Sequence, residues 1–293
     1  MDEETDVSQE EVEMYLVTGA TGNVGSNVVK QLLDMGKQVR VFVRDSAKVS
    51  HWGNRVEVAV GEYGKAESFA KAISGVDGAF LVNRGADSES FSQLLTSAKE
   101  QGDPRIVFLS SLLAGDPALK IGQMHKEQED AIRESRLRST FLRPGAFMSN
   151  AFQWLWSVKA EGIVYNPMSG GKTAPIAVED IAAVAVKALT KHDTAELVHE
   201  LTGAEFLSTP EQVAILAEAL NRPLRCVDVP IDAAVQGLVK SGIPEAMAAA
   251  VAESFQAIRE GRTVTVTDTV ERVTGNKPKT FAQWANENSA RFA

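Results

Sequence analysis

The chain has 293 residues, 44% of them hydrophobic, which is enough for one large domain or for one domain with an attached lobe. Its 39 acidic and 30 basic residues give a net charge of −9, which argues against nucleic acid and anionic membranes as partners. The single cysteine, Cys226, excludes a disulfide framework, and the sequence has neither a membrane-spanning apolar stretch nor a signal-peptide pattern. We therefore expect a cytoplasmic monomer or homodimer that acts on a small-molecule substrate. Residues 1–13 are acidic and polar, and we expect a disordered leader or a cloning remnant there.

Residues 14–44 carry the strongest functional signal. A short apolar strand at residues 14–18 leads into a glycine-rich turn at 19–25, then a helix from Ser26 to about Met35 and a second strand at 38–43. A glycine-rich turn between a strand and a helix is typical of a dinucleotide-binding site, because glycine lets the backbone approach the pyrophosphate at the helix N-terminus. The alternative is an ordinary tight turn. The cofactor-binding candidates here are Gly19, Thr21, Gly22, Asn23, Val24 and Gly25.

The end of the second strand bears on which dinucleotide is bound. NAD sites usually place an acidic residue about 20 residues beyond the turn, where it accepts a hydrogen bond from the ribose 2′-hydroxyl. That acid is missing here, and Arg44 stands in its place, with Lys48 one turn later. A permanently charged guanidinium suits the 2′-phosphate of NADP. The sequence therefore favours NADP(H), with a solvated surface arginine as the alternative for Arg44. Asp45 comes one position later and is as well suited to capping the next helix.

Strands and helices continue to alternate as far as residue 150. We expect strands at 55–60, 79–82, 105–109 and 139–143, and helices at 66–73, 90–101 and 121–136. This alternation predicts an α/β fold with a doubly wound parallel sheet, whose ligands lie beyond the carboxyl ends of the strands. The candidates at those ends, besides the glycine turn and Arg44, are Gly61, Glu62, Val82, Asn83, Ser110, Ser111, Pro144, Gly145 and Phe147.

Beyond residue 150 the pattern becomes mostly helical. We expect helices at 151–160, 178–189, 231–240 and 244–259, a loop at 166–173, and a helix ending at Ala219 with Thr209 as N-cap and Pro210 at the first helical position. Residues 199–202 are expected to return to the main sheet as a strand, and 225–229 to form another strand. We therefore predict a Rossmann domain at 14–150 and, at 151–293, a smaller helical lobe that binds the substrate.

Several segments resemble the NmrA-like atypical short-chain dehydrogenase/reductases. The glycine spacing G-x-x-G-x-x-G is similar to theirs, and so are His125-x-x-x-Glu129, the segment 140–150, the segment 178–182, and Thr274-Gly275 with Phe281-Ala282-Gln283-Trp284. The likeness spans nearly the whole chain from residue 14 and is most specific for the triphenylmethane reductase and NADPH quinone reductase types. It implies NADP binding and either a reductase or a redox-sensing regulator without turnover.

The usual catalytic pair of that superfamily, a Tyr with a Lys four residues later, is absent. The three tyrosines, Tyr15, Tyr63 and Tyr165, are followed at that distance by Gly, Glu and Ser. The remaining candidate is His125, with Glu129 one helical turn later, where a carboxylate can hold the imidazole in one tautomer. The resemblance supports His125, because a catalytic lysine or histidine falls at this position in relatives. An ordinary surface His/Glu pair is the alternative.

Four aromatic residues are candidates for a flat substrate pocket: Phe147, Phe152, Trp154 and Trp156. Burial in the core between the lobes is an equally good interpretation of the last three. The other histidines, His51, His192 and His199, have no metal-ligand spacing, so no metal site is expected. We expect an NADPH-dependent reductase that passes hydride to a planar electrophile, such as a quinone, an imine or iminium, a dye cation or an enone. The alternative is a non-catalytic NADP-binding sensor.

Overall fold

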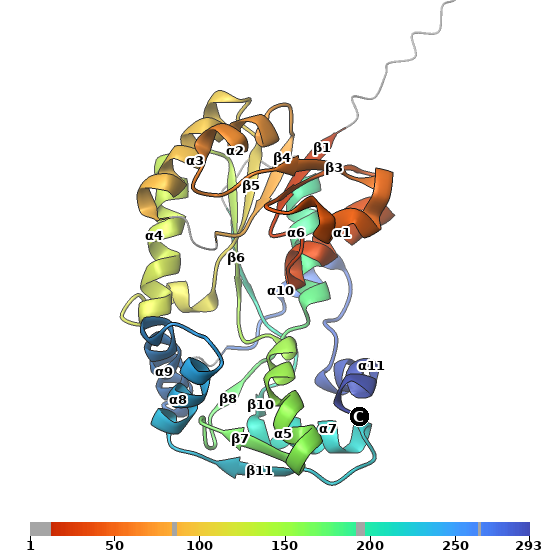
Figure 1. Ribbon diagram of the computed structural model, residues 1–293, viewed down its shortest axis with the longest axis vertical. Helices are drawn as coiled ribbons and strands as arrows, with labels where there is room; N and C mark the ends of the chain where they lie inside the picture. The colour runs from red at the N-terminus through yellow and green to blue at the C-terminus, as the bar shows by residue number, and fades with distance from the viewer. Residues whose placement is uncertain (1–12, 84–86, 192–196, 263–264) are drawn as a thin grey trace, which may run out of the picture.

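The computed structural model describes residues 13–83, 87–191, 197–262 and 265–293. Its centre is a seven-stranded parallel sheet with the order β3-β2-β1-β4-β5-β6-β9 (Figure 1). The strands are β1 (Met14–Thr18), β2 (Gln38–Val43), β3 (Glu57–Val60), β4 (Gly78–Leu81), β5 (Arg105–Leu109), β6 (Ser139–Pro144) and β9 (Leu197–Leu201). The predicted return of residues 199–202 to the main sheet is thus confirmed.

Helices cover both faces of this sheet. On one face α1 (Asn23–Asp34) and α6 (Val178–Thr190) pack against side chains such as Val17 and Val107. On the other, α2 (Ala66–Ile73), α3 (Ser88–Glu100) and α4 (Lys120–Glu134) pack against side chains such as Leu16 and Phe108. Because successive strand residues point to opposite faces, the inner strands β1, β4 and β5 carry apolar residues on both faces, with few polar exceptions such as Thr18 and Arg105. The predicted doubly wound α/β fold is confirmed.

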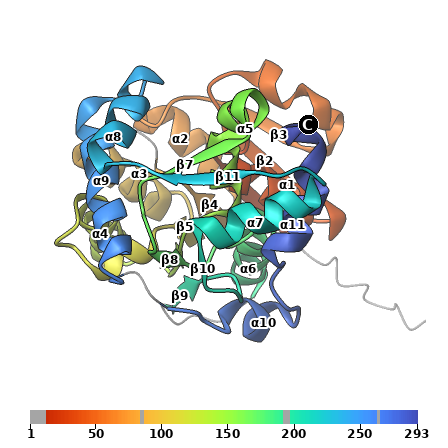
Figure 2. The ribbon, with the colours of Figure 1, turned by 90° about the horizontal axis from the view of Figure 1, so that it is seen from below.

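A second group of elements lies below the sheet in Figure 1. It contains two small sheets, in which β7 (Ile163–Asn166) pairs with β11 (Arg225–Asp228) and β8 (Lys172–Thr173) with β10 (Leu207–Ser208). Figure 2, seen from below, shows β7 and β11 crossing in front of the larger sheet. The helices here are α5 (Leu155–Glu161), α7 (Thr209–Ala219), α8 (Ile231–Lys240), α9 (Glu245–Arg259) and α11 (Phe281–Phe292), while α10 (Thr269–Thr274) lies beside α6 and β9.

The structure corrects several details of the predicted lobe. The N-cap of α7 is Ser208, one residue earlier than expected, because its hydroxyl and Glu211 form a capping box. A 3₁₀ helix at Met148–Trp154 precedes α5 where a single helix was expected. Strands β7, β8 and β10 were not predicted, and β8 lies inside the expected 166–173 loop. Strands of two to four residues leave too little alternation in the sequence to be recognised.

The described structure includes only the last residue of the expected leader at 1–13. Residues 1–12 of the expected leader lie outside the described residues, whereas Glu13 places its carboxylate 2.6 Å from the ammonium group of Lys37. In the described part of the chain, no helix is long and apolar enough to cross a membrane.

Candidate active site

The glycine turn forms the tightest part of the site. Gly19 adopts the left-handed φ of +61°, and a Cβ there would lie 3.3 Å from the Val82 side chain. A Cβ on Gly25 would lie 2.2 Å from the carbonyl oxygen of Gly19, a distance no side chain tolerates. Both glycines are therefore required by the geometry. The turn closes through a 2.8 Å hydrogen bond from the Gly22 N–H to the Gly19 carbonyl.

The same turn leaves the first N–H groups of α1 available to a ligand. Gly22 is the N-cap and supplies no side-chain cap, and no described residue accepts a hydrogen bond from the N–H groups of Asn23, Val24 or Gly25. These donors and the positive end of the helix dipole suit an anion. The glycine cradle thus fits a dinucleotide pyrophosphate. Thr21 is exposed at the mouth of this turn.

Gly25→Val should weaken NADPH binding at least about tenfold, because the turn must move away from the pyrophosphate position and each lost charge-assisted contact is worth about 1.5–3 kcal/mol. Titration of protein fluorescence with NADPH measures the change. Gly237→Ala is the matched control, because a Cβ there meets no atom within 4 Å and the position is helical. Unchanged affinity in a folded Gly25→Val variant would exclude this turn as the pyrophosphate site.

Thr18, which sequence reasoning did not select, holds the turn in place. Its hydroxyl donates to the Phe80 carbonyl at 3.0 Å and accepts from the Val82 N–H at 2.9 Å. It therefore joins β1 to β4. The chain connections diverge to the two sides of the sheet between these two strands, and doubly wound sheets bind their ligands at such a point. The sequence did contain a sign of this role, since Thr18 directly precedes Gly19, the first glycine of the turn. Val82 and Asn83 follow β4 here and are half-buried.

Arg44 and Lys48 are both exposed just beyond the carboxyl end of β2. Asp45 caps the 3₁₀ helix Ser46–Arg55 by accepting from the Ala47 N–H at 3.0 Å, which confirms its capping interpretation. No described residue forms an ion pair with Arg44 or Lys48 within 4.0 Å. Both cations are therefore accessible to a phosphate at this strand end.

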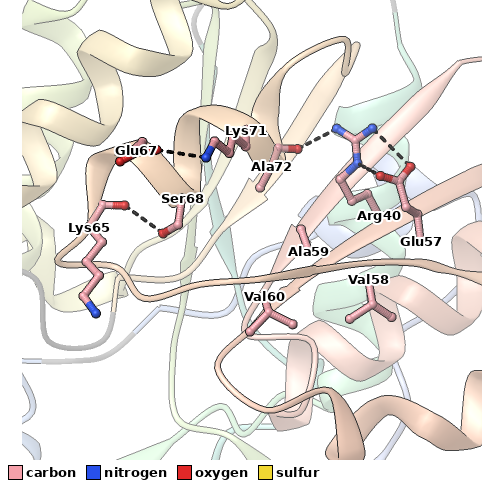
Figure 3. Close-up of a pocket in the computed structure, with 10 residues that line it drawn as sticks. All are labelled: Arg40, Glu57, Val58, Ala59, Val60, Lys65, Glu67, Ser68, Lys71 and Ala72. Atoms are coloured by element: carbon pink, nitrogen blue, oxygen red, sulfur yellow. Dashed lines mark hydrogen bonds and ion pairs between the residues drawn. The ribbon is translucent and has the colours of Figure 1, made fainter.

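Gly61 and Glu62 have contacts within the fold. A Cβ on Gly61 would lie 2.5 Å from atoms of Phe42 and Ser68, so this glycine permits close packing of side chains. Glu62 is exposed and lies 3.4 Å from Lys65. Beside them a groove of about 470 Å³ runs between β3 and α2, where the guanidinium of Arg40 holds Glu57 and the Ala72 carbonyl (Figure 3). This groove lies beside β3 and α2, away from the glycine turn.

A buried ionic cluster lies beneath the carboxyl ends of β5 and β6. The carboxylate of Glu129 is fully buried and accepts two hydrogen bonds from Arg143, at 2.8 and 2.6 Å, and one from the Ser110 hydroxyl at 2.6 Å. Arg133 adds a longer contact of 3.3 Å. Helix α4 is thereby fastened to both strand ends.

This cluster corrects two expectations. The Glu129 carboxylate is engaged by Arg143 and Ser110, and the Nδ1 atom of His125 is buried without a hydrogen-bond partner among the described residues, so Glu129 does not hold the imidazole. The Ser110 hydroxyl donates its proton to Glu129, so it could contact a nicotinamide ribose only by accepting a hydrogen bond. Sequence reasoning overlooked Arg143 as the partner because its position at a strand end gives no sign of which carboxylate it meets.

His125 lies in the second turn of α4 and is partly buried. Burial lowers the pKa of its imidazole, and the negative charge of Glu129 offsets only part of this effect. The ring is therefore mostly neutral at pH 7. A neutral imidazole polarises a substrate by hydrogen bonding, and it becomes a strong proton donor only at lower pH.

The start of α4 is positioned from the lobe. No side chain of its own caps the helix, and the carboxylate of Glu253 on α9 accepts a hydrogen bond from the Lys120 N–H at 2.8 Å. Gly122 packs against the 3₁₀ helix Leu112–Gly115 so closely that a Cβ would lie 2.2 Å from the Leu113 carbonyl oxygen. The helix bearing His125 is thus held by the strand ends and by α9.

The other strand-end candidates have structural contacts of their own. The hydroxyl of Ser111 accepts from the Leu113 N–H at 3.2 Å and caps the 3₁₀ helix. Pro144 ends β6, and the Gly145 N–H donates to the Leu201 carbonyl at 2.9 Å. Phe147 is half-buried and forms a bridge with Ile176. They line the junction between the sheet and the lobe.

The aromatic residues of the lobe correct the predicted substrate pocket. Phe152 packs against Trp284 and Phe292, with ring centroids 5.0 and 5.9 Å apart, and Arg291 lies over its ring. Trp154 packs against the same lobe core, whereas Trp156 is 72% exposed. Core packing is therefore the better interpretation of Phe152 and Trp154. Sequence periodicity could not identify α11 as their partner.

The described residues contain no group of three or more His, Cys, Asp or Glu side chains that could hold a metal ion. His192 lies outside the described residues.

Known proteins resemble this chain over most of its length. A family model described as NAD(P)H-binding matches residues 19–192. An NAD(P)H azoreductase of Xenophilus azovorans is 34% identical over 283 residues, covering 95% of this chain and 99% of the relative. A (4-alkanoyl-5-oxo-2,5-dihydrofuran-3-yl)methyl phosphate reductase of Streptomyces griseus is 34% identical over 282 residues, covering 96% and 99%. The chain belongs to the NAD(P)H-binding, NmrA-like family.

Solved structures agree in fold. An Escherichia coli NADPH-dependent quinone oxidoreductase with bound NADPH has a TM-score of 0.84 at 22% identity, covering 94% of this chain and 99% of that one. The NADP(H) complex of Citrobacter sp. triphenylmethane reductase has a TM-score of 0.82 at 22% identity, covering 94% and 100%. These structures show the fold, and the two reductases at 34% identity make the chain an NAD(P)H-dependent oxidoreductase.

Proposed function

We propose that this chain is an NADPH-dependent reductase that transfers hydride to a planar electrophile such as a quinone, an azo compound, an imine or iminium, an enone or a dye cation. The observation that carries the proposal is the pairing of an intact glycine cradle with a half-buried, neutral His125 and no Tyr/Lys pair. The named activities of the relatives, which include azo, quinone and triphenylmethane reductases, support this acceptor class.

The chain's own residues bind and orient the cofactor and polarise the acceptor. NADPH supplies the hydride when bound. The N–H groups at the start of α1 would hold the pyrophosphate, and Arg44 with Lys48 would hold the 2′-phosphate at the end of β2. His125, on a helix fixed by the Glu129–Arg143 pair, presents its imidazole to the acceptor. Hydride transfer to a neutral ketone creates an alkoxide that needs a strong proton donor, whereas a cationic acceptor is neutralised by the hydride itself.

Arg44→Ala should remove most of a preference for NADPH over NADH. Losing one charge-assisted contact of about 1.5–3 kcal/mol corresponds to roughly 10- to 150-fold weaker NADPH binding, with NADH affinity nearly unchanged. Fluorescence titration with both cofactors measures the ratio. Arg55→Ala, which changes an exposed arginine at the end of the 3₁₀ helix Ser46–Arg55 that follows Arg44, serves as the control. Equal affinity of the unmutated protein for both cofactors would contradict this assignment.

A panel of acceptors tests the proposed function. NADPH oxidation should proceed with quinones, azo compounds, imines and cationic dyes, and should be far slower with simple aliphatic ketones. The measurement is the initial loss of absorbance at the NADPH band, with each acceptor at saturating cofactor. Binding of NADPH with no turnover on any acceptor would instead identify a non-catalytic sensor.

A further inference from the structure

A cavity of about 170 Å³ lies on the α6 face of the large sheet, at the beginning of strands β5, β6 and β9. The glycine turn and His125 belong to the opposite, carboxyl ends of the strands, so this cavity is separate from the candidate active site. Its polar lining consists of Arg105, Thr140, Lys191, His199 and Arg272.

The floor of the cavity is polar and buried. Arg105, Thr140 and His199 are 7%, 5% and 9% exposed. Val107 and Leu142 pack on the α6 face, and strand alternation puts Arg105 and Thr140 on that face, while His199 lies opposite Leu142 in the sheet. Three polar side chains therefore stand where the rest of this face is apolar.

The described lining of the cavity is positively charged. Arg105 donates to the carbonyl of Leu189 near the end of α6, and Lys191 follows directly after that helix. Arg272 on α10 lies 3.7 Å from the exposed Asp268, outside the lining. Among the described lining residues none carries a carboxylate. Burial, together with the charges of Arg272 and Lys191, lowers the pKa of His199, which shows that its surroundings are positive.

Some hydrogen-bond donors in this cavity have no partner among the described residues. No described residue makes a hydrogen bond with the Thr140 hydroxyl or the His199 ring, and no described carboxylate pairs with Lys191. Basic residues at a helix C-terminus commonly complement the helix dipole, and this accounts for Arg105. It also accounts for Arg272, which lies in the last turn of α10 and donates to the Thr269 hydroxyl at 3.3 Å, but it does not account for the two uncharged donors on the floor.

We propose that this cavity binds a small oxyanion of phosphate size, either free or as the phosphoryl group of a small metabolite. Lys191 and Arg272 would supply charge from the rim, and Thr140 would donate from the floor. An anion here would join α6 and α10 to the sheet and so stabilise the fold without touching the cofactor site.

Thermal unfolding in inorganic phosphate tests the proposal. With NADP⁺ saturating, so that Arg44 is occupied, phosphate should raise the melting temperature above that in chloride at equal ionic strength. In the double variant Lys191→Gln/Arg272→Gln the half-saturating phosphate concentration should rise at least about tenfold. The control Lys65→Gln/Lys71→Gln removes the same charge from exposed lysines beside α2 and should respond like the unmutated protein.

The NMR signal of the His199 ring shows directly whether phosphate binds in this cavity. Its NMR signal, assigned with His199→Gln, should shift with phosphate over the same concentration range. No stabilisation by phosphate, equal stabilisation in the double variant, or an unmoved His199 signal would each overturn the proposal. NADPH affinity and reductase activity in the double variant should be unchanged, so these outcomes do not depend on the proposed function.

Discussion

Replacing Glu129 by alanine should lower the free energy of unfolding by about 3–5 kcal/mol, because the substitution leaves Arg143 as an unpaired, largely buried charge. The side chain of Arg143 is only 13% exposed, and that of Glu129 is 0% exposed. Ser110 would lose its partner as well. Urea unfolding, followed by fluorescence, measures the difference.

Two comparisons separate this effect from a general sensitivity of α4. Asp130→Ala removes a carboxylate on the same helix whose pairs with Lys126 and Arg133 are more exposed, so it should cost about 1 kcal/mol or less. Glu129→Gln keeps the shape and part of the hydrogen bonding and should fall between the two. If Glu129→Ala and Asp130→Ala cost the same, the buried cluster does not anchor α4.

The stability supplied by Glu129 should also depend on pH. Burial by itself would raise the pKa of the carboxyl, but the hydrogen bonds from Arg143 and Ser110 and the charges of Arg143 and Arg133 bring it below its usual value. A lowered folded pKa means that this stability is present above the unfolded value of about 4.3 and is lost as the pH falls through the folded pKa. Acid unfolding of Glu129→Gln should therefore show a weaker pH dependence in that range.

His125→Ala should slow the reduction of quinones and imines by about 10²- to 10⁴-fold, the range for loss of a general acid, and barely affect a permanently cationic dye. The structure adds a pH dependence. Because burial lowers the His125 pKa, the protonated ring becomes abundant only below the ordinary value of about 6.5. Turnover of neutral acceptors should thus rise as the pH falls, while turnover of the dye cation should not.

Measuring kcat for both acceptor types in one variant separates the possible roles. His51→Ala, an exposed histidine beside Trp52, should change neither rate. NADPH affinity and the melting temperature of His125→Ala should stay close to those of the unmutated protein. A parallel loss on both acceptors would mean that His125 positions substrate or cofactor, and no loss on either would make it an ordinary surface residue.

Part of the site could be derived from the sequence because it is local. The strand, glycine turn and helix at residues 14–34 are contiguous, and the clash that makes Gly25 necessary is with the backbone of Gly19 in the same turn. The absence of an acidic residue after β2 and the presence of Arg44 there can likewise be derived from a short stretch of sequence. The alternation of strands and helices predicted the parallel sheet, since few topologies satisfy it.

Tertiary structure alone decided which distant side chains meet. His125 and Glu129 share a helix face, so spacing suggested a pair, but Arg143 from β6 competes for the carboxylate with a bidentate geometry that imidazole cannot match. Phe152 was a pocket candidate by type, yet α11, about 130 residues later, supplies the aromatic core that buries it. The cationic cavity combines residues from five separate elements and their flanks. Such contacts depend on packing between segments far apart in the chain, which periodicity does not encode.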